Sequence, residues 1–136
     1  MSHLQYTRRK KMIRLTAYKE LNQPWEEITE TLESIAASIG ETHVWYEMEP
    51  NMQPEAYPYE EEIAHYLETT RDNGPAISIN GIEFDVFTGD MIGKTEAPRN
   101  DGFISWPAVL PYYIRKYHLR LPKEAEDHIL KKLRVK

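Results

Sequence analysis

The segment 77–87 alternates apolar and polar residues on both sides of an Asn80-Gly81 pair. Such alternation is typical of a strand with one buried face. Asn-Gly is the favoured pair for a two-residue type I′ turn, because both turn residues need positive φ. We therefore expect a β-hairpin that turns at 80–81 and buries one face. The predicted inward face holds Ile77, Ile79, Ile82, Phe84 and Val86.

Four other segments carry apolar residues at helical spacing, which predicts helices packed against the hairpin. Several of them start at or next to a proline followed by glutamates, a pattern typical of the first helical turn. We expect Ser105 to be the N-cap of the third of these helices. The four segments are 24–39, 59–70, 106–118 and 122–133.

Two further segments complete the expected fold. Residues 10–22 fit both a helix face and a strand face, and their good helix formers favour a helix. Residues 43–48 are rich in β-branched and aromatic side chains and predict a strand. The order of these elements predicts an α+β fold, with a small antiparallel sheet built on the 77–87 hairpin and packed with about four to five helices.

Composition narrows the class of protein. The chain has 136 residues, 40% of them hydrophobic, which suits a single domain over 1–136. It contains no Cys, so disulfide scaffolds, Cys-ligated metals and thiol nucleophiles are excluded. The basic N-terminal arm, 1–11, is not followed by an apolar stretch, and no stretch approaches the roughly 20 apolar residues of a membrane span. We therefore expect a cytoplasmic protein.

The charges are segregated along the chain. Residues 1–19 carry six bases and no acid, residues 20–111 carry 19 acids and three bases, and residues 112–136 carry eight bases and three acids. Acids at helix starts and bases at helix ends account for part of this pattern. The basic run from Arg8 to Lys11 has no such explanation, because cations are unfavourable near a helix start. The segregation is compatible with a surface that binds a charged macromolecule and with charges that only complement helix ends.

No catalytic constellation emerges from the sequence, so we expect no enzyme, no cofactor and no metal. The weaker alternative is a metal-dependent nuclease. Asp85 and Lys94, with Glu41 or Glu60 upstream, partly match the D…ExK pattern of such enzymes. The acid that should stand two residues before Lys94 is replaced by Ile92.

The leading hypothesis is a binding module that uses the acidic, Tyr- and Pro-rich segment 47–62. Tyrosine is enriched in protein interfaces, and proline lowers the entropy cost of ordering a loop. Tyr57 is the expected anchor, because Tyr59 is assigned to the core face. The segment is equally compatible with a solvated loop that leads into a helix. As a binding surface it predicts a small inhibitor or accessory protein, of immunity or phage type, whose partner presents a basic protein surface. The predicted contacts are Glu49, Glu55, Tyr57, Glu60 and Glu61.

The second hypothesis is nucleic-acid binding. Bases in the N-terminal arm and on the outer face of the 106–118 helix would contact phosphates, and a tyrosine beside them would stack on bases. The acidic middle of the chain argues against it, since nucleic-acid binders are usually basic. The predicted contacts are Arg8, Arg9, Lys10, Lys11, Tyr112, Arg115 and Lys116.

Overall fold

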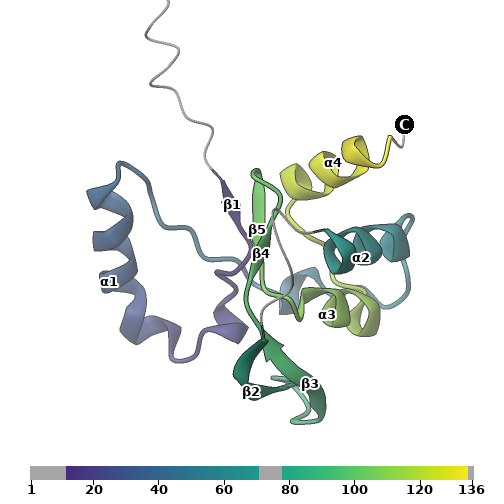
Figure 1. Cartoon of the computed structure of the whole chain (residues 1–136), viewed down its shortest axis with the longest axis horizontal. Coiled ribbons are helices and arrows are strands. Elements are labelled where there is room, and N and C mark those ends of the chain that lie inside the picture. Colours follow the sequence, from purple (N-terminus) through teal and green to yellow (C-terminus); the bar gives the residue numbers. More distant parts are fainter. Residues whose placement is uncertain (1–11, 71–77, 135–136) are drawn as a thin grey trace, which may run out of the picture.

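The computed structural model describes residues 12–70 and 78–134. Figure 1 shows helices α2, α3 and α4 on one side of a small sheet, α1 on the other side, and a hairpin at one end. The α+β class with a small sheet is confirmed. The elements are β1 (Ile13–Arg14), η2 (Lys19–Leu21), α1 (Trp25–Ser38), η3 (Glu49–Asn51), α2 (Glu60–Thr69), β2 (Ser78–Phe84), β3 (Met91–Glu96), β4 (Arg99–Asn100), β5 (Ile104–Trp106), α3 (Leu110–Tyr117) and α4 (Lys123–Lys132).

The three-stranded sheet has the order β1-β5-β4, with β5 in the centre. β5 and β1 are parallel, with Ile13 opposite Ile104. β5 and β4 are antiparallel. Strands this short form few ladder hydrogen bonds, so the sheet depends on side-chain packing for its stability.

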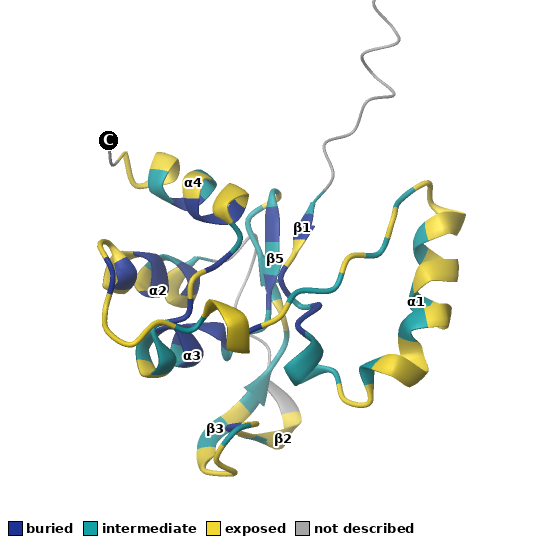
Figure 2. Ribbon diagram, turned by 180° about the vertical axis from the view of Figure 1, so that it is seen from behind, coloured by how far each residue is buried: buried dark blue, intermediate teal, exposed yellow. Residues whose placement is uncertain are grey.

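The core lies where α2, α3 and α4 cover β5, as the dark blue segments of Figure 2 show. Trp106 of β5 is fully buried, and its indole N–H donates to the carbonyl of Leu67 at 3.0 Å. This contact ties the sheet to α2. Other fully buried side chains are Leu15, Tyr18, Met48, Ile63, Leu67, Ile104, Leu110, Tyr113, Ile114, Leu119 and Ile129.

The hairpin does not turn at Asn80-Gly81, so that prediction is wrong. β2 runs through both residues and pairs with β3, with Ile82 opposite Lys94, and the chain turns over 85–90. Asp85 closes this turn, because its carboxylate accepts the backbone N–H groups of Phe87 and Thr88 at 2.7 and 3.1 Å. Gly81, with φ of 146°, lies instead at an irregularity in the strand register.

The apolar face of the hairpin is not in the core, and the prediction that it is buried is also wrong. Ile82, Phe84 and Val86 are 49%, 51% and 46% exposed. Ile77 and the side chain of Ile79 lie outside the described residues. The hairpin contacts the body at its turn, where the Phe87 ring packs edge-on against Tyr113, so most of its length projects from the molecule.

Three of the predicted helices occur close to their expected bounds, as α1, α2 and α4. The predicted 106–118 helix begins later, at Leu110, and Ser105 lies in β5 instead of capping it. The expected strand at 43–48 is reduced to a single bridge between Tyr46 and Tyr18.

The prediction of a helix over 10–22 is wrong for residues 12–22, which the structure describes, because this stretch contains β1 and η2. The backbone N–H groups of Ile13 and Leu15 bond to the carbonyls of Phe103 and Ser105 at 2.9 and 2.7 Å. Pairing with β5 thus overrides the local helix propensity.

Candidate protein-binding groove

An open groove of about 820 Å³ lies between β3 and the start of α3. Its β3 wall consists of the five consecutive residues 92–96. A strand face would contribute only alternate residues, since successive side chains point to opposite sides. The groove therefore runs along β3, and Glu83 of β2 also lines it.

The edge of β3 that borders the groove carries free backbone groups. Within the described chain, β3 pairs with β2 alone. In an antiparallel pair, alternate residues direct their N–H and C=O groups away from the partner strand. Such an edge can accept a further strand.

Part of the opposite wall of the groove is apolar. It contains Pro107, Val109 and Pro111, and Ile92 faces them from β3. The same side of the groove also carries Tyr112, Arg115 and Lys116, so apolar and charged side chains share it. The groove thus combines a polar strand edge with a partly apolar lining.

Asp85 sets the position of β3 relative to α3. Its buried carboxylate accepts hydrogen bonds from the hydroxyl groups of Tyr112 and Tyr117, at 2.8 and 2.6 Å. Burial alone would raise the pKa of Asp85, but the hydrogen bonds from Tyr117, Tyr112 and the backbone of Phe87 and Thr88 outweigh it and hold the pKa at about 2. The alternation over 77–87 predicts Asp85 on the outward, polar face of a strand, whereas this residue closes the turn. The sequence signal for the turn is an Asp three residues before Thr88-Gly89.

The predicted nucleic-acid contacts on α3 are neutralised by acids. Arg115 binds Glu61 at 2.8 Å and Glu68 at 3.0 Å, and its hydrogen bonds lower the pKa of both carboxyls. The Lys116 ammonium group lies 3.6 Å from Asp85 and 3.7 Å from Asp90.

Of the remaining predicted nucleic-acid contacts, Tyr112 alone lies in the described part of the chain. Tyr112 lines the groove, and its hydroxyl group donates a hydrogen bond to the Asp85 carboxylate. Arg8, Arg9, Lys10 and Lys11 lie outside the described residues.

Tyr57, the expected anchor of the acidic segment, is buried and therefore not available as a surface anchor. Tyr59 is 42% exposed, so its assignment to the core face is wrong. The Tyr57 hydroxyl donates to the carbonyl of Leu119 at 2.5 Å, and the Arg120 guanidinium stacks 4.3 Å from the centre of the Tyr57 ring. The Pro-rich loop folds back over the end of α3, where Met52 bridges to Leu119. The loop therefore covers the protein's own core.

Of the four predicted acidic contacts in that segment, one is buried and three are exposed. Glu60 is buried and lies 2.9 Å from the Nδ1 atom of His118, and Glu61 binds Arg115. Glu49 and Glu55 are exposed. Because Tyr57 and Glu60 are buried, the predicted contact set is not exposed as a whole, and contacts through Glu49, Glu55 and Glu61 stay a prediction.

The residues of the nuclease hypothesis do not converge. Glu41 binds Arg14 at 3.1 Å and Glu60 contacts His118, while Asp85 lies in the hairpin turn. Over residues 12–70 and 78–134, no group of three or more His, Asp or Glu could hold a metal ion. In the same residues, no helix is long and apolar enough to cross a membrane.

Comparisons with protein-family models, with curated protein sequences and with solved structures found no match to this chain.

Proposed function

We propose that this protein is a non-enzymatic module that binds another protein by adding an extended segment of that protein to the edge of β3. The observation that carries the proposal is the outer edge of β3, which pairs with no strand of residues 12–70 and 78–134, beside a partly apolar groove of about 820 Å³. In strand addition, main-chain hydrogen bonds supply affinity and alternate side chains supply specificity. Here those side chains would enter the space lined by Ile92 and Val109.

The charges of the groove favour an uncharged segment over nucleic acid. Its lining carries Glu68, Glu83 and Glu96 against Lys94, Arg115 and Lys116, so the acids and bases balance. Phosphate binding needs cations that are free to release counterions. Two of these three cations are already paired with carboxylates of the protein.

A module that covers a segment of another protein would act as an inhibitor or accessory of that protein. This role belongs to the class of function expected from the sequence, but its binding surface is the groove and not segment 47–62.

Selection of peptides from a random displayed library against the full chain would test the proposal. Selected peptides should alternate apolar and polar residues, and their binding should shift the backbone amide signals of residues 92–96. Ala108→Trp, which fills the groove, should weaken binding by about tenfold or more. Ala56→Trp, at an exposed alanine outside the groove, should leave it unchanged.

Two results would contradict the proposal. One is a set of selected peptides that bind the Ala108→Trp variant with the same affinity as the wild-type protein. The other is tight binding of DNA or RNA that weakens when Arg115 and Lys116 are replaced, which would favour the nucleic-acid hypothesis.

A further inference from the structure

Two charged side chains of the groove between β3 and α3 have no ionic partner within the described chain. Most of the charged residues that line the groove form ion pairs with other residues of the protein. These paired residues are Glu68, Glu96, Arg115 and Lys116. Glu83 of β2 and Lys94 of β3 also line the groove, but they form no ion pair within residues 12–70 and 78–134. These two charges are therefore available to a segment that binds in the groove.

The strand register places the two charges on opposite faces of the hairpin. Glu83 lies directly opposite Gly93, and Lys94 lies directly opposite Ile82. Residues that are directly opposite each other share a face, whereas successive residues of a strand alternate between the faces. Glu83 and Gly93 therefore lie on one face of the hairpin, and Lys94 lies on the other.

Gly93 leaves a gap beside Glu83. A Cβ atom at this position would meet no other part of the described chain within 4 Å. Gly93 also lacks the positive φ that would require a glycine. A strand added to the outer edge of β3 would lie two strand spacings from β2, or about 10 Å. Its residue opposite Gly93 would therefore face Glu83 across a position that has no side chain.

We infer that the partner segment carries an arginine opposite Gly93, and that its guanidinium group binds the Glu83 carboxylate. The inference rests on the proposed addition of a strand to β3 and names the residue that the groove selects. Arginine suits this position because it is long, always charged and able to form two parallel hydrogen bonds with a carboxylate. An acidic residue at the same position would instead repel Glu83. The rest of the segment stays uncharged.

Peptide libraries displayed to the full chain and to its Glu83→Gln variant test this preference. Peptides selected on the wild-type protein should carry an arginine at one fixed position, and peptides selected on Glu83→Gln should not. Replacing that arginine by glutamine in a selected peptide should weaken binding to the wild-type protein by about threefold or more in calorimetric titration. The same replacement should leave binding to Glu83→Gln almost unchanged. Nuclear Overhauser contacts should place the arginine next to Gly93.

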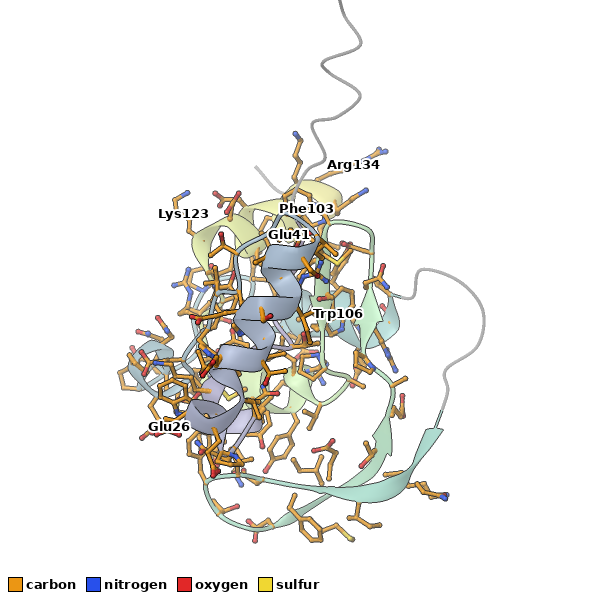
Figure 3. The ribbon with its side chains drawn as sticks, turned by 90° about the vertical axis from the view of Figure 1, so that its left-hand side faces the viewer. Glu26, Glu41, Phe103, Trp106, Lys123 and Arg134 are labelled. Atoms are coloured by element: carbon orange, nitrogen blue, oxygen red, sulfur yellow. The ribbon has the colours of Figure 1, made fainter. Side chains whose placement is uncertain are left out.

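Gly93→Val tests the gap itself. A valine there should prevent the arginine from reaching Glu83, so the arginine preference should disappear although the glutamate is retained. Lys94→Gln removes the charge on the opposite face, and peptides selected on it should still carry the arginine. Lys123→Gln is the control outside the groove, because Figure 3 shows Lys123 at the end of the molecule away from the hairpin. It should change neither the affinity nor the preference.

The outcomes separate this inference from the proposed function. Peptides that shift the amide signals of residues 92–96 but carry no arginine would overturn the inference and leave the strand addition standing. An aromatic residue in place of the arginine, retained on Glu83→Gln, would overturn it by showing that the gap selects size and not charge. An acidic residue that is lost on Lys94→Gln would overturn it by assigning the charge preference to the other face. If no peptide binds at residues 92–96, the strand addition itself is refuted, and the inference with it.

Discussion

At the scale of single residues, Asp85 is the polar side chain that organises the groove. It is buried, yet it stays ionised because two tyrosine hydroxyls and two backbone N–H groups donate to it. It links the hairpin turn to two residues of α3, Tyr112 and Tyr117. Removing its charge should therefore loosen the hairpin.

Asp85→Asn should lower the free energy of unfolding by about 2 kcal/mol, because hydrogen bonds to a charged group each contribute about 1.5–3 kcal/mol and the amide can replace only some of them. Urea unfolding measures the change. Asp90→Asn is the matched control, because Asp90 is exposed and its nearest cation, Lys116, lies 3.7 Å away. An equal loss in both variants would contradict the role given to Asp85.

Stability should also fall in acid through Asp85 and Asp101. Burial raises the pKa of Asp101, but hydrogen bonds from Tyr66, from the backbone of Ile104 and Phe103, and from His128 outweigh it and hold its pKa at about 2. A pKa that is lower in the folded state than in the unfolded state stabilises the protein above the ordinary carboxyl pKa, and this contribution is lost as the pH falls towards the folded value.

The free energy of unfolding should therefore decrease between about pH 4 and pH 2, by about 2 kcal/mol for each of the two carboxyls. Urea unfolding at several pH values checks this. Asp85→Asn should flatten part of the decrease. A wild-type protein whose stability stays constant over this range would contradict the assignment.

At the scale of elements, the hairpin shows how a turn is chosen. Asn80-Gly81 has the residues of a tight turn, but the Asp85 turn gains contacts to α3 that a turn at 80–81 would lack. Gly89 supplies the positive φ, 80°, that the observed turn requires. Gly93 lies in β3 without positive φ and has open space around its Cα atom.

Gly89→Ala should lower the free energy of unfolding by about 1 kcal/mol, because alanine resists positive φ. Gly93→Ala should be neutral or slightly stabilising, since it restricts the unfolded chain without strain. Thermal unfolding of the two variants compares them directly. A larger loss of stability in Gly93→Ala than in Gly89→Ala would contradict a turn at Gly89.

At the scale of the whole molecule, stability is unevenly distributed. α3 is buried in the core, whereas α1 buries none of its residues and is held mainly through Trp25 and Thr29. Regions with few buried apolar contacts open with small free energies.

Hydrogen exchange followed by mass spectrometry should therefore show faster exchange in Trp25–Ser38 than in Leu110–Tyr117. Equal protection of the two helices in the free protein would contradict this distribution.

The sequence by itself determined the elements that depend on neighbouring residues. The apolar spacing, the prolines and the first-turn glutamates located α1, α2 and α4 to within a residue or two, because helix hydrogen bonds join residues that are close in the chain. The same local reasoning recognised that the chain is an α+β protein.

The tertiary structure alone decided which side chains remain available for binding. Asp85 is held by Tyr112 and Tyr117, Tyr57 is covered at Leu119, and Arg115 is paired with Glu61 and Glu68, all across long separations in the chain. No local pattern encodes such pairings, because each depends on which elements the core brings together. For the same reason, the groove beside β3 became visible only once the rest of the chain had packed without covering it.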